Sequence, residues 1–305
     1  MPDAKQILVA GYQADRTISH TTARLAARGI PFKVLDLAQY LQAATVVQHP
    51  QCALSARIVL DGLTLDFDLY SAAYVRLIEL REHRLLPREV AISVRRKMAA
   101  LEQFFVELPM RVINRPGGRQ SNSSKPFQLV ELHAAGFRVP RSYSTNMPDA
   151  PGLADLISIG QVVYKSNSAM RSVVDRAGRS HLHRLAHLPN CPVLFQDYIA
   201  GPDVRVHLVG PRVFGQQIRA KVVDYRYPGP LDRVEYQSLD VPHEIAVLCQ
   251  RFAEAEGLGF MGFDFKIAHD GTWYCLEANP MPGYDAFDER SDHRIADALI
   301  DELRQ

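Results

Sequence analysis

The sequence predicts an α/β protein whose C-terminal part is α+β. Near the N-terminus, two short apolar runs, 7–11 and 32–37, flank an amphipathic stretch over 19–28. This order is typical of a βαβ unit, and it predicts a small doubly wound domain around a parallel sheet. Further along, the apolar runs 204–209 and 213–221 follow each other across a short glycine-proline turn, which predicts an antiparallel pair. The chain therefore combines two kinds of sheet.

Length and composition limit the classes of function. The 305 residues are enough for two or three compact units, and 47% hydrophobic with 23% charged residues is ordinary for a globular protein. A formal net charge of +1 gives no global field that would attract nucleic acid or an anionic membrane. No apolar run approaches the roughly 20 residues of a membrane span, and no signal-peptide pattern is present. Four scattered cysteines are typical of reduced thiols, so we expect a cytoplasmic protein without membrane or nucleic-acid partners.

The remaining elements extend this outline along the chain. A hairpin is expected over 58–65 and a strand over 72–77, and apolar residues at helical spacing predict a long helix over 87–108. No G-x-G-x-x-G follows the first strand, so a dinucleotide site is not expected. A strand at 111–113 and a glycine- and serine-rich crossing mark a boundary. Later elements are expected as helices over 125–133, 242–257 and 294–303, and as strands over 142–145, 162–165 and 193–199.

The stretch 260–288 carries the most informative pattern. Asp270-Gly271 predicts a hairpin with a two-residue loop, since both central positions of such a turn need positive φ. Asp264 and Glu277 then face each other directly, with Asn279 on the same side of the sheet. The other side is expected to be a core surface. It would consist of Phe263, Phe265, Ile267, Tyr274, Leu276 and Ala278.

Two facing carboxylates need compensation. At about 5 Å and an effective dielectric of about 20, they repel by roughly 3 kcal/mol. A magnesium ion would remove this repulsion, because carboxylate and amide oxygens are the ligands that Mg²⁺ prefers. A shared proton or a contact with an arginine would serve as well. The hairpin alone leaves these alternatives open.

Other residues fit a nucleotide. Lys125 and Lys165 each lie next to small polar residues, as compact phosphate ligands would, although a single lysine after a strand is often only a surface residue. The stretch 196–199 can present backbone to an adenine ring, and Asp203 can accept from ribose hydroxyls. His181, His183 and His187 have a spacing that permits metal binding, but nothing else in that segment indicates a site.

In this order the residues resemble the ATP-grasp superfamily, and more closely its carboxylate–amine ligases related to the ribosomal-protein glutamate ligase. The resemblance covers about 112–300, and the first hundred residues look like the leading α/β domain of that family. It implies an ATP-grasp fold with two lobes that clamp ATP. The implied domains are a leading α/β domain over 1–110, a central lobe over 111–198 and a C-terminal lobe with the metal hairpin over 199–305.

The resemblance also assigns roles. Lys125 and Lys165 would hold the phosphates of ATP, and Asp203 the ribose. The adenine would meet the stretch of Gln196, Asp197 and Ile199. The ligands of Mg²⁺, with two ions expected and Mn²⁺ as a substitute, would be Asp264, Glu277 and Asn279.

Two departures from the family pattern affect the catalytic residues. The loop SNSAMRS after Lys165 lacks the glycines usual in the family, so Arg171 is expected to grip phosphate directly. Gly262 stands where some relatives carry an arginine. Arg219 is therefore the candidate that steadies the acyl phosphate, because a fork of N–H donors suits developing phosphate charge.

The implied reaction is a two-step ligation. A substrate carboxylate attacks the γ-phosphorus of ATP, which gives an acyl phosphate and ADP, and an amine then displaces phosphate. Four arginines are candidates to hold the carboxylate of an amino-acid or peptide substrate, although each alone is more often a structural ion pair. They are Arg76, Arg115, Arg205 and Arg226.

Two alternatives remain beside an amino-acid or dipeptide ligase. The tail NPMPGYDAFD is also similar to ATP-grasp enzymes that macrocyclise ribosomal peptides, which implies a maturation enzyme with a docking surface near helix 87–108. The other alternative is a non-catalytic ATP-binding module. A homodimer is also considered. The identity of the two substrates cannot be derived from the sequence, because fold does not determine specificity.

Overall fold

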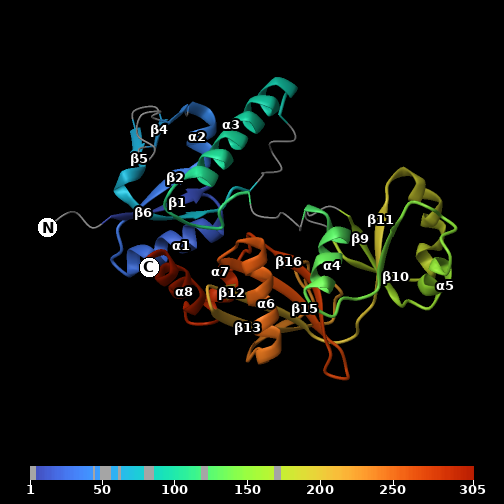
Figure 1. The fold of residues 1–305 in the computed structure, drawn as a ribbon. Coiled ribbons are helices and arrows are strands. Elements are labelled where there is room, and N and C mark those ends of the chain that lie inside the picture. Colours follow the sequence, from blue (N-terminus) through green and yellow to red (C-terminus); the bar gives the residue numbers. More distant parts are fainter. Residues whose placement is uncertain are drawn as a thin grey trace. The chain divides into compact units, whose positions relative to one another are not determined.

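The computed structural model describes residues 5–43, 45–48, 56–60, 63–78, 86–117, 123–167 and 173–305 (Figure 1). The chain divides into two compact units. The first is formed by 1–119, 256–260 and 281–305, and the second by 120–255 and 261–280. The last 25 residues therefore belong with the N-terminal unit, and the three-domain division at 110 and 198 stays a prediction.

The first unit is built on a four-stranded parallel sheet in the order β2-β1-β6-β7. The βαβ opening is confirmed, with α1 between β1 and β2. Figure 1 shows α3 on one side of this sheet and α1 with α8 on the other, as in a doubly wound domain. The elements are β1 (Gln6–Gly11), α1 (Arg16–Ala27), β2 (Phe32–Asp36), β6 (Tyr70–Val75), α3 (Arg88–Glu107), β7 (Arg111–Ile113) and α8 (Arg294–Leu303).

Smaller elements complete this unit. A three-stranded antiparallel sheet joins β3 (Thr45–Gln48), β4 (Ala56–Leu60) and β5 (Leu63–Asp66), followed by the 3-10 helix η1 (Phe67–Leu69). The short helices are α2 (Leu37–Ala43) and α7 (Asp285–Glu289). The core of the unit contains Leu8, Leu35, Tyr40, Phe67, Leu101 and Phe105. The long helix therefore buries the C-terminal part of its predicted apolar face, whereas Val90 near its start is exposed.

The second unit contains two sheets. The first is antiparallel, in the order β10-β9-β11-β8, and is accompanied by α5 and the 3-10 helix η4. The histidines at 181, 183 and 187 lie on η4. The elements are β8 (Ser142–Thr145), α5 (Leu153–Ser158), β9 (Val162–Ser166), β10 (Asp175–Ala177), η4 (Arg179–Asn190) and β11 (Val193–Asp197).

The other sheet of this unit has five strands in the order β14-β13-β12-β15-β16. The predicted antiparallel pair is confirmed as β12 and β13, and the change from α/β to α+β is confirmed with it. The elements are α4 (Lys125–Ala134), β12 (Asp203–Val209), β13 (Arg212–Ala220), β14 (Val234–Leu239), α6 (His243–Glu256), β15 (Phe260–Ile267) and β16 (Trp273–Asn279).

The turn between β15 and β16 differs from the predicted two-residue loop. Gly271 N–H donates to Ala268 O and Ala268 N–H to Thr272 O, so the loop has three residues, 269–271. Gly271 has φ +83°, whereas Asp270 is not among the residues with positive φ. This is the turn followed by one left-handed glycine that three-residue hairpins commonly use. The Asp270 carboxylate instead accepts the Thr272 N–H at 2.9 Å.

A β-bulge in the same hairpin changes which side chains share a face. Asp264 pairs with Glu277 as predicted, but Phe265 pairs with Cys275, so one residue of β16, Leu276, has no partner. Tyr274 consequently lies opposite Lys266 and not on the core surface. The predicted core positions Tyr274 and Leu276 are therefore wrong, and buried Cys275 takes their place.

Gly201 permits the close approach of the β11–β12 connection to the hairpin. Its φ is +143°, and a Cβ at this position would lie 1.9 Å from the carbonyl oxygen of Ile267. The neighbouring Pro202 carbonyl accepts the Ile267 N–H at 3.1 Å. The connection that leads into Asp203 is thus fixed against β15. No helix in the described ranges is both long and apolar enough to cross a membrane.

Candidate functional site

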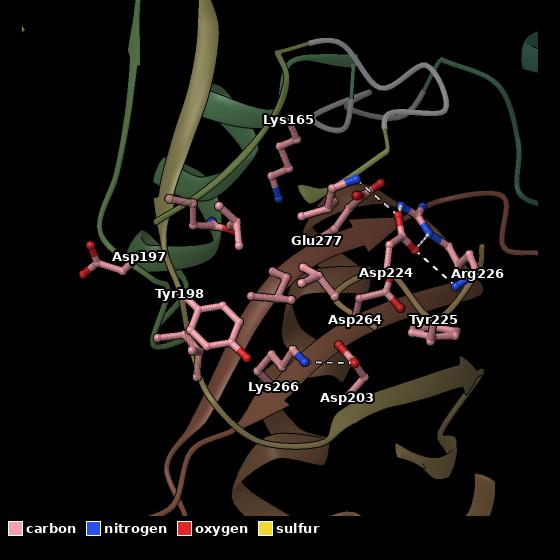
Figure 2. Close-up of a pocket in the computed structure, with 16 residues that line it drawn as sticks. Lys165, Asp197, Tyr198, Asp203, Asp224, Tyr225, Arg226, Asp264, Lys266 and Glu277 are labelled. Carbon is pink, nitrogen blue, oxygen red and sulfur yellow. Dashed lines mark hydrogen bonds and ion pairs between the residues drawn. The ribbon is translucent and has the colours of Figure 1, made fainter. Parts of the chain in front are cut away.

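A pocket in the second unit collects most of the predicted residues (Figure 2). It contains about 710 Å³ of space between atoms, part of it open to solvent. Its walls come from the ends of β9 and β11, from the start of β12, from the loop 223–226 and from the β15–β16 hairpin. Lys165, Gln196, Asp203, Asp264 and Glu277 all line it.

The hairpin contributes the acidic wall of this pocket. Asp264 and Glu277 are directly opposed in the β15–β16 register, as the sequence predicts. The bulge at Leu276 turns Leu276 and Glu277 toward the pocket together. A contact with an arginine, one of the alternatives to a metal ion, is present here, because Arg205 donates to Asp264 Oδ1 at 2.8 Å. Glu277 supplies the second carboxylate of this wall.

Arg205 is a structural partner of the acidic wall. Its side chain lies on β12, the residue is 6% exposed, and its Nε also lies 3.3 Å from His207 Nε2. Burial disfavours the charged guanidinium, but the Asp264 carboxylate outweighs burial, so the pKa of Arg205 is raised. Arg205 does not line the pocket. Its predicted role as a substrate ligand is therefore not supported by its position.

Lys165 provides the opposing charge. It is 6% exposed at the end of β9, and Figure 2 shows its ammonium group extending into the pocket toward Glu277. No hydrogen bond or ion pair to this ammonium occurs within the described ranges. Burial is the main cause that lowers the pKa of Lys165 to about 8, with Glu277 acting in the opposite direction. A buried ammonium without a bonded anion suits a site that receives an anionic ligand.

Lys125 lies close to Lys165 and Glu277. Burial lowers its pKa, against the effect of Glu277. Helix α4 sets its position, because one turn further on Gln128 donates to Ala278 O at 2.6 Å and accepts from Ala278 N at 3.1 Å. Since Ala278 follows Glu277 on β16, this amide clamp places Lys125 beside the acidic wall.

The stretch 196–199 forms the side of the pocket at the end of β11. Gln196 is buried and donates to Ser142 Oγ at 3.0 Å. Tyr198 and Ile199 line the pocket, whereas Figure 2 shows the Asp197 carboxylate pointing away from it. Arg141 holds that carboxylate at 2.7 Å. Asp197 therefore contributes backbone rather than its side chain.

Asp203 lines the pocket and forms an ion pair with Lys266, which also lines it. Lys266 was not among the residues selected from the sequence. Lys266 Nζ lies 2.9 Å from its Oδ2 and 3.1 Å from the Gly201 carbonyl oxygen. Burial raises the pKa of Asp203 to about 6, and Lys266 works against this shift. Lys266 lies two residues after Asp264 on β15 and therefore on the same face of the sheet, so strand alternation was the signal that could have found it.

The loop 223–226 adds a second ion pair, between Arg226 and Asp224. Arg226, but not Asp224, was selected from the sequence. Arg226 makes two bonds to Asp224, at 2.7 and 2.6 Å, and Val174 N–H also donates to that carboxylate at 3.3 Å. Burial opposes ionisation of Asp224, but these hydrogen bonds lower its pKa. The hydrogen bond with Asp224 raises the pKa of Arg226. The sequence signal was the D-Y-R triplet, in which only Arg226 was selected.

Arg219 is not brought to the pocket. On β13, Ile218 pairs with Asp203, so Ile218 shares the face of the site and Arg219 lies on the opposite face. Arg219 is exposed and pairs with Glu235 of β14. The acyl-phosphate role predicted for Arg219 is therefore not supported by its position.

Two of the predicted substrate arginines belong to the first unit and are bonded there. Arg76 donates to Asp15 at 2.9 Å and to the Met281 carbonyl oxygen at 2.6 Å. Arg115 donates to four carbonyl oxygens at and after the end of α3, those of residues 105, 106, 108 and 110. Both guanidinium groups thus hold backbone, which is a structural role.

The remaining predicted residues are placed as follows. Asn279 lies opposite Gly262 on the hairpin but does not line the pocket itself. Arg171 lies outside the described residues. The histidines 181, 183 and 187 do not converge with other described ligand groups on one point.

Comparisons with known proteins bear on this arrangement. No protein-family model matches the chain. It is 27% identical over 202 residues to β-citrylglutamate synthase B of Danio rerio and 27% identical over 209 residues to N-acetylaspartylglutamate synthase A of Homo sapiens. These alignments cover 63% and 64% of this chain but 50% and 52% of the relatives. The chain thus spans about half the length of these curated relatives.

Solved structures extend the likeness to nearly the whole chain. The ATP-grasp ligase PsnB, complexed with a phosphomimetic variant of its minimal precursor, Mg and ADP, matches with a TM-score of 0.81. The sequences are 25% identical, and the match covers 97% of this chain and 98% of PsnB. This chain has the ATP-grasp fold. The resemblance that the motifs suggested is confirmed, and so is the fold class.

The lowered pKa of the buried Lys165 ammonium can be tested without any ligand, through the pH dependence of protein stability. With a folded-state pKa of about 8 and an ordinary value of 10.5, Lys165 binds fewer protons in the folded than in the unfolded chain between these pH values. The free energy of unfolding therefore rises with pH in that window, and the penalty is fully present below it. Lys165→Met should raise the stability of the nucleotide-free protein at pH 7, by up to about 3 kcal/mol. The gain should shrink toward pH 10.

Urea unfolding of the variant and the wild type at pH 7 and pH 10 measures this difference. Lys221→Met, at an exposed position of the same unit, is the matched control and should change stability little at either pH. A gain for Lys165→Met that stays the same at both pH values would show that proton binding at Lys165 is not its cause.

Proposed function

We propose that the chain is an ATP-dependent carboxylate–amine ligase that forms an amide bond and releases ADP and phosphate. The observation that carries this proposal is the buried Lys165 ammonium, which has no bonded partner among the described residues and faces the opposed carboxylates Asp264 and Glu277 across one pocket. A nucleotide bound with a divalent cation satisfies both sides, because phosphate oxygens meet the lysine and the cation meets the carboxylates. The similarity to named synthases and to an ATP-grasp ligase supports this reading.

ATP would lie along the pocket. Lys165 and Lys125 would hold its phosphates, the backbone at Gln196 to Ile199 would meet the adenine, and Asp203 would accept from the ribose hydroxyls. Asp203 is suited to this, since Lys266 binds Oδ2 and fixes the orientation of the carboxylate. PsnB was solved with ADP and Mg, which supports the choice of nucleotide and cation.

The donor set fits magnesium. Asp264 and Glu277 are opposed on the hairpin, and Asn279 lies one repeat further along β16, so the set consists of oxygen donors. Arg205 holds Asp264 Oδ1 and thereby orients the carboxylate, with Oδ2 as its second oxygen. Magnesium, when bound there, would supply charge neutralisation for the phosphoryl group. Mn²⁺ would be accepted by the same oxygens.

The residues of the chain would act by positioning and charge. A substrate carboxylate would attack the γ-phosphorus, ADP would leave, and an amine would then displace phosphate from the acyl phosphate. The lysines would orient the phosphates for in-line attack. Arg226, fixed by two bonds to Asp224, offers a held guanidinium at the pocket, and it replaces Arg219 as the candidate that faces developing phosphate charge.

The carboxylate substrate would be an amino acid or a peptide. The two curated relatives make glutamate conjugates by their names, which favours a small-molecule amide product. PsnB was solved with a precursor peptide, which favours the alternative of a peptide-maturation enzyme. A non-catalytic ATP-binding module is disfavoured because Lys165 and both carboxylates line one pocket and Lys125, which does not line it, lies within electrostatic reach of Glu277. A cytoplasmic location and a homodimer belong to this proposal, and they are tested by cell fractionation and by light scattering.

One prediction of the proposed function concerns the reaction products. With ATP, Mg²⁺ and panels of carboxylate and amine substrates, phosphorus NMR should show ADP and orthophosphate in equal amounts, with sustained turnover only when both substrates are present. Glu277→Gln should reduce turnover by at least about a hundredfold, because the variant loses one charge at the metal position. Its circular dichroism spectrum should match that of the wild type. Release of AMP and pyrophosphate would contradict the proposed mechanism.

A further prediction compares the kinetic effects of replacing two arginines, Arg226 in the loop 223–226 and Arg219 on the neighbouring strand β13. Arg226→Lys keeps the charge but loses the planar fork that Asp224 holds, so kcat should fall at least about tenfold. Arg219→Lys is the matched control, and it should leave kcat and the KM for ATP nearly unchanged. Steady-state kinetics with saturating substrates measures both. An equal loss in the Arg219 variant would return the acyl-phosphate role to Arg219.

A further inference from the structure

A second constellation of ligand groups lies in the first unit. Asp288, on α7, is 0% exposed. Its Oδ2 lies 2.7 Å from His20 Nε2 of α1 and 3.3 Å from His293 Nδ1, the residue before α8. Two imidazole nitrogens from distant parts of the sequence therefore meet one buried carboxylate oxygen.

The other oxygen of Asp288 fixes the carboxylate. Oδ1 accepts the N–H groups of Ile295 at 2.8 Å and of Ala296 at 3.0 Å, at the start of α8. Both oxygens are thus held by the fold, and Oδ2 cannot turn away from the two imidazoles. Asp292 and His293 have φ +51° and +61°, the left-handed conformation that directs the His293 ring to this point.

We propose that His20, Asp288 and His293 form a binding site for a divalent transition metal of the zinc class, separate from the ATP pocket. Two imidazoles with one carboxylate suit Zn²⁺ and related ions, whereas Mg²⁺ prefers oxygen ligands. The metal would tie α1 to the segment of α7 and α8. The proposal does not depend on the proposed ligase activity.

The distances agree with such a site. In a tetrahedral zinc site, ligand atoms lie about 3.4 Å apart, given bonds of about 2.0–2.1 Å. The His293–Asp288 separation of 3.3 Å already has this value, and the three ligand atoms all lie within 4.8 Å of one another. His20 Nε2 would have to withdraw from 2.7 Å to about 3.4 Å, which is a small rotation of a long side chain.

Charge and access also favour a cation. Asp285 and Glu289 on α7 add negative charge around His20. The side chain of His293 is 42% exposed, whereas that of His20 is 13% exposed, so the ion would enter from the His293 side and a water could complete the coordination. The alternative occupant is a proton, since the hydrogen bond with Asp288 raises the pKa of His20.

A titration of the full, metal-stripped chain without nucleotide or Mg²⁺ distinguishes these occupants. One equivalent of Co²⁺ should give the visible absorption of a tetrahedral site, and Zn²⁺ should displace it. Zn²⁺ at about 100 times its Kd should raise the Tm by about 5 °C. His293→Asn should lower the zinc affinity at least about tenfold, and it should fold, because asparagine tolerates positive φ.

The matched control is His187→Asn, an exposed histidine on η4 in the other unit, which should bind zinc as the wild type does. His20→Gln provides an independent variant on the buried side of the site. The proposal is overturned if the wild type shows no tetrahedral Co²⁺ spectrum. It is equally overturned if His293→Asn and His20→Gln both respond to zinc as the wild type does.

Discussion

The candidate site depends on the electrostatic balance between two facing carboxylates and two buried lysines. The β15–β16 register places Asp264 opposite Glu277, and in isolation this pair would destabilise the hairpin. Arg205, which lies on β12 and does not line the pocket, compensates part of the negative charge by donating to Asp264 at 2.8 Å. Lys165 faces Glu277, no anion is bonded to it in the part of the chain that the structure describes, and burial lowers its pKa to about 8. The charges therefore suit an anionic ligand that carries a bound cation, with the anion at the lysines and the cation at the carboxylates.

The surrounding structure serves this balance. Helix α4 is clamped to β16 through Gln128 and Ala278, which fixes Lys125 near Glu277. Gly201 lets the connection before β12 lie against β15, where a side chain would collide with the Ile267 carbonyl oxygen, and this fixes Asp203 beside Lys266. Lys125 and Asp203 are thus positioned by contacts that the elements carrying them make with the hairpin.

The sequence predicted the parts that depend on local patterns. The periodic helices over 87–108 and 294–303 and the βαβ opening are present, because hydrophobic period is a local signal. The pairing of Asp264 with Glu277 is present as well, but the three-residue loop shifts the register by one residue and the bulge shifts it back at this pair. The bulge at Leu276 was not predictable in this way, since one inserted residue leaves the composition of the strand unchanged. It reassigned Tyr274 and Leu276. Lys266, the partner of Asp203, lies two residues after Asp264 on β15, so strand alternation alone places it on the face of the site.

The arginines show the limit of residue type as a signal. A guanidinium suits phosphate, carboxylate and backbone carbonyl oxygens equally, so the sequence could not distinguish Arg226 at the pocket from Arg115 at the end of α3. Arg219 was misplaced because strand alternation, fixed only by the register with β12, turns it to the opposite face. Long-range register and tertiary partners decide such roles, and neither is encoded in a short motif.

The central claim is that the carboxylate pair binds a divalent cation together with the nucleotide. Electron paramagnetic resonance of Mn²⁺ measures this most directly, by counting free ion in the presence of the protein with and without a non-hydrolysable ATP analogue. The account predicts that the wild type binds Mn²⁺ much more tightly when the analogue is present. In Asp264→Asn, the only bound Mn²⁺ should be the amount that the analogue binds in the absence of protein. Mn²⁺ binding that is the same in the wild type and in Asp264→Asn would contradict it.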